Sequence, residues 1–394
     1  MSEIFHRRQL AEEMAAQLLR PGVLDQALRS GLFLSGVRRI GKTTFLKQDL
    51  IPALEAGGAI VIYVDLWSDT SVTPGVLLQR AARAKLSDLE DPLSVAFSVL
   101  KKVVSAELAA RGLKFKFDLS KLGEAGGVTL ADAFTEVVEQ SLTDLVLIVD
   151  EVQQCLASDD GLSMMLALKA ARDAINLRPN PPGHLVFIGT GSNRALVQEL
   201  SARRNMAFQG ARSLPYPVLG DDFVAHVLTR LRLQGSKVAP SQAVAAQAFK
   251  DLGSRPEELL NALRVLAYSL PAGAGPDTTL QIIVATVRAG IANAELVRIQ
   301  ELGPLAEAIF DRLASSQETQ TRGLYSTEAA DEYAKELGRR VRNEEIQNVV
   351  QQLQGANIIM RLGHGAYTIV DPFIREMWLE KKEQLAKPAN QHYR

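Results

Sequence analysis

Residues Gly36 to Thr44 carry the pattern of a loop that binds a chain of phosphates. They read GVRRIGKTT, so four residues separate two glycines, and Lys42 and Thr43 follow the second glycine. Glycines let the backbone curl until successive N–H groups point inward, and the N-terminus of a following helix adds partial positive charge. Lys42 would reach the β- and γ-phosphates of a nucleotide, and the Thr43 hydroxyl would ligate Mg²⁺.

The other loop residues would contact the nucleotide mainly through their backbone. Thr44 would touch the α-phosphate, whereas Arg38 and Arg39 would screen phosphate charge or meet a partner, unless they are ordinary exposed loop charges. A chance match to the pattern is expected on the order of 1% of the time in a chain of this length. The predicted nucleotide-binding residues of the loop are Gly36, Val37, Arg38, Arg39, Ile40, Gly41, Lys42, Thr43 and Thr44.

Two acidic residues end an apolar run far from this loop. LVLIVDEVQ places Asp150 and Glu151 at the C-terminal end of a buried strand, which is where ligands bind in open α/β sheets. Asp150 would hold the Mg²⁺, and Glu151 would polarise the attacking water. A helix cap followed by a first-turn acid is the alternative. The phosphate loop favours the catalytic interpretation, since phosphoryl transfer needs both parts.

Two polar residues follow the next apolar run, in GTGSNR. Ser192 and Asn193 could reach the γ-phosphate or the water, although both residue types are also common in turns. No other catalytic constellation stands out. The five histidines are scattered, so no zinc spacing exists, and the single cysteine, Cys155, is expected to be a buried packing residue.

Short apolar runs that alternate with helical segments must position these residues. The predicted strands lie within 31–36, 59–67, 145–150 and 184–193. Strands alternating with helices predict an α/β fold, a P-loop NTPase parallel sheet with helices on both faces. An insertion at about 73–141 contains KFKFDLS, whose alternation predicts a short half-exposed strand at Lys114 to Ser120.

Strand signals fade after about residue 220, and three domains are predicted. The P-loop core would span 1–220, a helical lid 221–302 and a winged-helix domain 303–394. The last prediction depends on three helical stretches followed by a hairpin, in which Met360 to Leu362 and Ala366 to Val370 flank a Gly-His-Gly turn.

Composition narrows the class of protein. The chain has 394 residues, 47% of them hydrophobic, and a net charge of -1, which excludes a globally basic nucleic-acid binder. One cysteine excludes an internal disulfide and fits a reducing cytoplasm. The N-terminus lacks the apolar core of a signal peptide, and no apolar run is expected to span a membrane.

With these elements placed, the sequence resembles AAA+-type P-loop ATPases, and more narrowly the STAND and archaeal-ATPase branch near the origin-recognition clade. The segments that carry the resemblance are GVRRIGKTT, YVDLW, LVLIVDEVQ, FIGTGSN, GSRPEELL and DPFIREMW. The resemblance implies that Arg255 is a lid residue that contacts the phosphates, unless GSRP simply begins a helix. It also implies an arginine finger, for which Arg203, Arg204 and Arg212 are candidates, or none.

The expected activity is Mg²⁺-dependent hydrolysis of ATP to ADP and phosphate, used as a switch that controls a protein partner or self-assembly. One alternative is a DNA-binding ATPase of the initiator or transposition-helper type. Against it, the helix at the recognition position begins with Glu344 and Glu345, although Arg339, Arg340 and Arg342 precede it. The other alternative is the ATPase component of a bacterial defence system with a separate effector.

Overall fold

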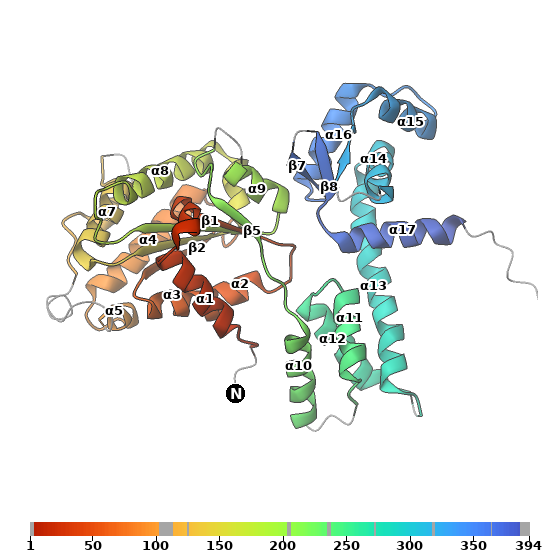
Figure 1. Ribbon diagram of the computed structural model, residues 1–394, viewed down its shortest axis with the longest axis horizontal. Helices are drawn as coiled ribbons and strands as arrows, with labels where there is room; N and C mark the ends of the chain where they lie inside the picture. The colour runs from red at the N-terminus through yellow and green to blue at the C-terminus, as the bar shows by residue number, and fades with distance from the viewer. Residues whose placement is uncertain are drawn as a thin grey trace, which may run out of the picture. The chain divides into compact units, whose positions relative to one another are not determined.

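The computed structural model describes residues 4–101, 113–123, 126–202, 206–234, 238–271, 273–316, 320–363 and 365–386. The chain divides into two compact units (Figure 1). The first comprises Met1–Gly36 and Lys42–Tyr216, and the second comprises Val37–Gly41 and Pro217–Arg394. The predicted division of the second part into a lid and a terminal domain at residue 302 stays a prediction.

A five-stranded parallel sheet forms the centre of the first unit, which confirms the predicted α/β class. Its strands are β1 (Leu32–Ser35), β2 (Ile60–Asp65), β3 (Leu145–Asp150), β4 (Leu185–Gly191) and β5 (Arg212–Pro215). Their order is β2-β3-β4-β1-β5. Parallel pairing brings the carboxyl ends of β1, β3 and β4 to one edge of the sheet, where the polar residues predicted from the sequence follow them.

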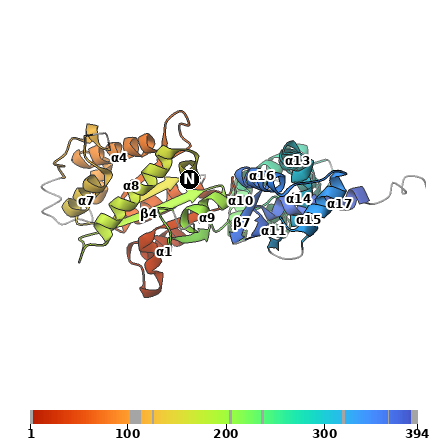
Figure 2. The same cartoon turned by 90° about the horizontal axis from the view of Figure 1, so that it is seen from above.

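Helices cover the sheet on both faces. In Figure 1, α7 and α8 lie above the strands and α1 and α3 below them, and Figure 2 shows α8 alongside β4. The helices of this unit are α1 (Arg8–Leu19), η1 (Val23–Ser30), α2 (Lys42–Phe45), η2 (Leu46–Leu50), α3 (Ile51–Ala56), α4 (Pro74–Glu90), α5 (Val95–Leu100), η3 (Leu119–Lys121), α7 (Leu130–Ser141), η4 (Val152–Ala157), α8 (Asp159–Asn176) and α9 (Arg194–Ala202).

The strands form because their side chains are apolar on both faces. Every residue of β1, β3 and β4 is buried, as expected for a parallel sheet with helices on each side. Phe187 stacks on Phe208 with ring centroids 4.1 Å apart, and Phe33 packs edge-on against the same ring. Cys155 is also buried in this core, as predicted, and burial raises its thiol pKa to about 12.

The predicted strand at Lys114 to Ser120 is wrong. Residues 114–118 form no strand, and the last two residues of the stretch begin η3. The backbone N–H of Phe115 donates to Glu90 Oε1, and that of Lys116 donates to Glu136 Oε1. Carboxylates on neighbouring helices therefore satisfy the donors that a partner strand would otherwise accept.

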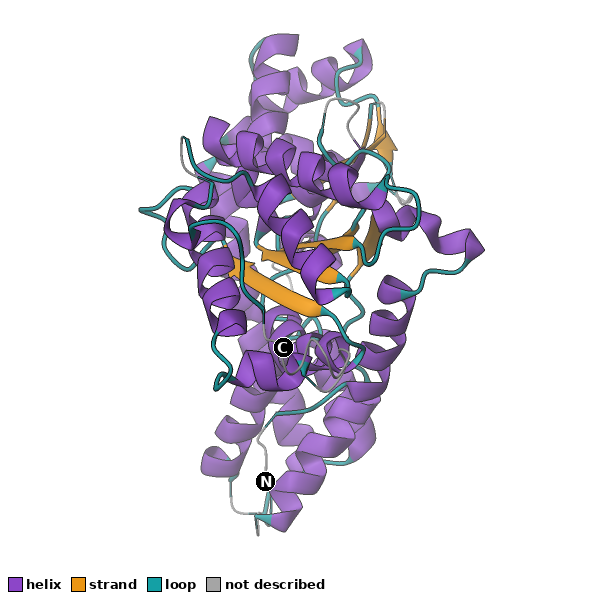
Figure 3. Ribbon diagram, turned by 90° about the vertical axis from the view of Figure 1, so that its left-hand side faces the viewer, coloured by secondary structure: helices purple, strands orange, loops and turns teal. Residues whose placement is uncertain are grey.

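The described part of the second unit is helical apart from one small sheet. Figure 3 colours the helices of the chain purple and its strands orange. Strands β6 (Thr321–Arg322), β8 (Ala366–Ile369) and β7 (Ile359–Gly363) form an antiparallel sheet in that order, which confirms the predicted terminal hairpin. The helices are α10 (Asp221–Leu233), α11 (Gln242–Asp251), α12 (Pro256–Ser269), α13 (Pro276–Glu301), α14 (Pro304–Ser315), α15 (Thr327–Leu337), α16 (Asn343–Gly355) and α17 (Pro372–Ala386).

Helix α13 differs from the expectation that no apolar run reaches the length of a membrane span. By length and composition alone it could cross a membrane. It packs instead against α11, α12 and α17, and its Arg288 forms ion pairs with Glu376 and Glu380 of α17. A single apolar helix with such partners is weak grounds for a membrane span.

Candidate functional site

The loop predicted to bind phosphates connects β1 to α2 and has the backbone that the motif requires. Gly41 has φ 89° and Arg39 has φ 66°, both in the left-handed region. Lys42 is 7% exposed, and its Nζ donates to the Gly36 carbonyl oxygen at 2.6 Å. The ammonium group of Lys42 therefore reaches back to the first glycine of the loop, whose carbonyl it contacts from the start of α2.

The helix after the loop contains a π-helical turn. Helix α2 continues directly into η2, which is π-helical, and then into α3. Such π-turns occur frequently at functional sites. Phe45 and Tyr216 pack edge-on next to this turn, and the Arg7 guanidinium lies over both rings at 5.8 and 5.6 Å from their centroids.

Asp150 is the most thoroughly bonded residue of the candidate site. Its carboxylate is 1% exposed. Oδ2 accepts hydrogen bonds from Thr43 Oγ1 at 2.8 Å and from Tyr63 Oη at 3.0 Å. Oδ1 accepts from Thr190 Oγ1 and from the Glu151 N–H. The structure thus brings the predicted metal ligands Thr43 and Asp150 together across 107 positions of sequence.

Tyr63 and Thr190 were not found from the sequence. Tyr63 lies on β2 and Thr190 on β4, the two strands that flank β3. The register pairs Tyr63 with Ile148, two residues before Asp150. Burial and the nearby carboxylates of Asp150 and Asp65 raise the pKa of the Tyr63 hydroxyl, so it stays a hydrogen-bond donor at neutral pH. The sequence signal that could have identified these two residues is a side-chain hydroxyl near the end of each strand that flanks β3.

The donor set fits Mg²⁺ bound together with a phosphate chain. A threonine hydroxyl and one buried carboxylate are hard oxygen ligands, and Mg²⁺ commonly takes one or two carboxylates and fills its octahedron with water and substrate phosphates. Within the described ranges, no group of three or more His, Cys, Asp or Glu side chains is placed to hold a metal ion. The chain by itself therefore offers a partial site of the kind that a nucleotide completes.

Glu151 lies directly beside Asp150 in an unusual backbone conformation. Its φ is 55°, in the left-handed region that non-glycine residues seldom occupy. Its Oε2 accepts hydrogen bonds from Ser192 Oγ at 2.8 Å, from the Ser192 N–H at 3.4 Å and from Gln153 Nε2. Glu151 is the residue that precedes η4, but its side chain makes no capping bond there. The carboxylate thus bonds both to Ser192, which directly follows β4, and to Gln153 of the helix that follows Glu151.

Asn193 has a structural partner of its own. It is buried, and its Oδ1 accepts from the Leu196 N–H at 3.0 Å, which caps the first turn of α9. The predicted contact of Asn193 with a γ-phosphate or water stays a prediction, and the residue already serves the ordinary role that its type suggested.

Arg255, on the second unit, is held by the C-terminal module. Its Nη2 donates to Asp371 Oδ2 at 2.8 Å, and its guanidinium lies over the Phe373 ring. Arg255 therefore has partners within the second unit, and its predicted contact with phosphate stays a prediction. In the same unit, Arg39 of the loop segment pairs with Glu258 at 3.3 Å, so this predicted loop residue has a protein partner.

Of the arginine-finger candidates, only Arg212 lies among the described residues. It is on β5 and forms an ion pair with Asp25. Arg203 and Arg204 lie outside the described ranges.

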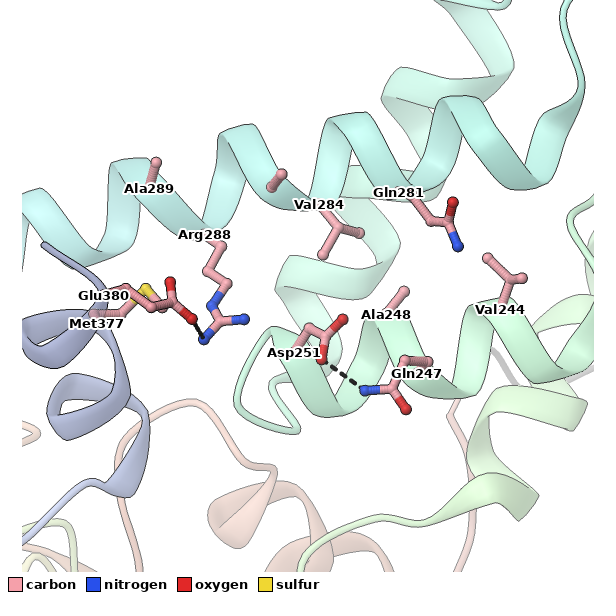
Figure 4. Close-up of a pocket in the computed structure, with 11 residues that line it drawn as sticks. Val244, Gln247, Ala248, Asp251, Gln281, Val284, Arg288, Ala289, Met377 and Glu380 are labelled. Atoms are coloured by element: carbon pink, nitrogen blue, oxygen red, sulfur yellow. Dashed lines mark hydrogen bonds and ion pairs between the residues drawn. The ribbon is translucent and has the colours of Figure 1, made fainter. Parts of the chain in front are cut away.

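A hollow in the second unit contains none of the predicted site residues. It has a volume of about 320 Å³ and lies between α11, α13 and α17 (Figure 4). Gln247 donates to Asp251 at its rim, and Arg288 pairs with Glu380. Apolar side chains such as Val284 and Met377 supply much of the remaining lining.

Comparison with known proteins supports the assignment of the fold. No family model matches the chain, and no curated protein matches its sequence significantly. A Walker-type ATPase of Pyrococcus abyssi is 18% identical over 95% of this chain and 96% of its own, with a TM-score of 0.54. The ORC2 protein of Aeropyrum pernix, in a structure with ADPNP and ADP, is 13% identical over 98% of each chain, with a TM-score of 0.50. At such identities the likeness concerns architecture, and the chain has the α/β fold of P-loop ATPases like these.

Proposed function

We propose that this protein binds ATP with Mg²⁺ and hydrolyses it to ADP and phosphate. The observation that carries the proposal is the Thr43–Asp150 contact, which joins the phosphate-loop motif after β1 to a buried acid at the end of β3, with β4 between the two strands. Lys42 at the start of α2 and Glu151 next to Asp150 complete the set. Catalysis of phosphoryl transfer depends mainly on positioning and electrostatic stabilisation, which this set of residues can supply.

Each residue has a distinct task in this proposal. The loop N–H groups and Lys42 hold the phosphates, and Thr43 and Asp150 hold the Mg²⁺, which would neutralise charge developing on the phosphates. Glu151 orients a water and accepts its proton. All the hydrogen bonds of the Glu151 carboxylate go to Oε2, which leaves Oε1 with no partner in the described part of the chain and available to that water.

The use of the ATP is a second part of the proposal. We infer that the nucleotide state changes a contact between the second unit and a protein partner or another copy of the chain. The three-helix module with an antiparallel hairpin, α14 to β8, fits a winged helix. Its link to the helices before it is a buried ion pair, Arg255–Asp371, so the second unit can act as one body.

The charges at the start of α16 disfavour the DNA-binding alternative. Arg339 and Arg342, which would offset the acids of this helix, both form ion pairs with Glu345. Their charge is thus partly neutralised at the position where DNA phosphates would need it. Negligible, salt-independent DNA binding with and without ATP would dismiss this alternative, and the defence alternative requires an effector encoded elsewhere.

The Lys42→Ala variant tests the proposed activity. It removes the charge that would contact the β- and γ-phosphates, so we expect ATP binding by calorimetry and phosphate release to be lost. Lys250→Ala is a matched control, because the Lys250 side chain is 62% exposed on α11 and lies outside the loop. Turnover in Lys42→Ala equal to that of the unmodified protein would refute the proposal.

A further inference from the structure

Gln153 is a polar residue of the site that neither the motif nor the proposed mechanism uses. It lies in η4, two residues after Glu151, and is 6% exposed. Its amide Nε2 donates to Glu151 Oε2 and lies 3.4 Å from Ser192 Oγ. The nitrogen must face the carboxylate, because the amide oxygen has no proton to donate to it. A buried amide thus contacts the carboxylate proposed to act as the base.

The surroundings of Gln153 leave room for its amide group beside Glu151 but offer no hydrogen-bond donor to the amide oxygen. Its Oε1 is buried and accepts no hydrogen bond. A β-carbon added at Gly191 would lie 2.1 Å from that oxygen, so the glycine at the end of β4 leaves the space that the amide occupies. Unsatisfied buried polar atoms are rare, and they require an explanation such as a functional role.

We propose that Gln153 is a positioning residue for Glu151, an inference that depends on the proposed ATPase activity. Gln153 Nε2, Ser192 Oγ and the Ser192 N–H all bond one oxygen of the carboxylate. Three donors on Oε2 fix the carboxylate and direct Oε1 toward the water. Glu151 itself has a left-handed backbone and directly precedes η4, the helix that carries Gln153.

The Gln153→Met variant tests this role, because methionine has a similar volume and no donor. We expect kcat for ATP hydrolysis to fall about 10-fold or more, which is part of the roughly 10²- to 10⁴-fold that a well-placed general base contributes. The KM for ATP and the melting temperature should stay unchanged, since the variant touches neither phosphates nor the apolar core. Gln154→Met is the matched control, because Gln154 is the neighbouring residue of η4 and is half-buried.

A double variant separates positioning from a merely structural effect. Glu151→Gln should itself turn over slowly, and adding Gln153→Met should then have no further effect, because the group that Gln153 orients is gone. Additive losses, an unchanged kcat, or a rise in KM that accounts for the loss would overturn the inference. So would faster turnover in Gln153→Met, which would make the contact inhibitory. Should Gln153→Met fail to fold, Gln153→Leu also removes the amide donor and should lower kcat without raising KM.

The failure of this inference and that of the proposed function give different results. If the unmodified protein hydrolyses ATP, Lys42→Ala does not, and Gln153→Met equals the unmodified protein, the inference alone is wrong. If the unmodified protein shows no Lys42-dependent hydrolysis, both are wrong.

Discussion

At the scale of single residues, the candidate site is organised around the buried carboxylate of Asp150. A buried carboxylate is costly unless hydrogen bonds compensate for its lost hydration. Thr43, Tyr63, Thr190 and the Glu151 N–H supply four such bonds, from the first turn of α2, the strands β2 and β4, and the residue that follows β3. The carboxylate is therefore held in one orientation before any ligand arrives, which lowers the cost of binding a metal.

Removing the Tyr63 hydroxyl should weaken the metal site. In Tyr63→Phe, Asp150 Oδ2 loses its bond from β2, so we expect the Mg²⁺ concentration for half-maximal ATP hydrolysis to rise about 10-fold, as for other partners of metal ligands. A Mg²⁺ titration of phosphate release measures this. Tyr268→Phe is the control, because Tyr268 is 88% exposed on α12. Equal Mg²⁺ dependence in both variants would show that Tyr63 has no role in the site.

At the scale of elements, a buried ion pair connects the start of α12 with the turn before α17. The side chains of Arg255 and Asp371 are only 10% and 12% exposed. Asp371 also accepts from the Phe373 N–H at 3.0 Å, which organises the first turn of α17. Since each charge is hidden from water, each depends on the other for compensation.

The Asp371→Asn variant should destabilise the second unit. Asparagine keeps the shape and the acceptor for the Phe373 N–H, but it leaves the Arg255 charge unpaired. We expect the free energy of unfolding to fall by about 3 kcal/mol, the lower part of the range for half-broken buried pairs. Urea denaturation followed by circular dichroism measures it. Lys250→Ala, which breaks the exposed pair with Asp221, should cost no more than about 1 kcal/mol. A similar cost in both variants would contradict this account.

At the scale of the whole molecule, the question is what nucleotide binding changes. The second unit presents apolar side chains to solvent, among them Tyr268 and Ile282, which are 88% and 63% exposed. Scattered exposed apolar residues are normal on any protein. These side chains therefore do not by themselves mark a partner surface, and a change of assembly state with nucleotide is the informative observation.

Measuring the mass of the protein with an ATP analogue, with ADP and without nucleotide tests whether nucleotide binding changes its assembly state. If ATP drives self-assembly, the full-length protein should form a larger species with a non-hydrolysable ATP analogue than with ADP or no nucleotide. Light scattering after gel filtration measures the mass, and Lys42→Ala should stay at the smaller mass throughout. A single mass in all three states would leave a different protein as the partner and exclude nucleotide-driven self-assembly.

The sequence by itself determined the parts of this protein that local patterns specify. Apolar runs predicted the buried strands β1 to β4, because a strand covered on both faces must be apolar throughout. The loop motif predicted Lys42 and Thr43, and the acids after β3 predicted Asp150 and Glu151. Strand β5 was missed because it has only four residues, which alternate between half-buried and exposed, and it exists through its pairing with β1.

Only the tertiary structure decided which residues support those parts. Tyr63, Thr190 and Gln153 have no motif of their own, and they matter because strand order and the turn after β3 carry them to Asp150 and Glu151. The partner of Arg255 could not be predicted from the sequence either, because Asp371 lies 116 residues away along the chain. Spacing along the chain encodes contacts within a loop or a helix turn. Contacts between elements depend on how the whole chain packs, and no short pattern carries that information.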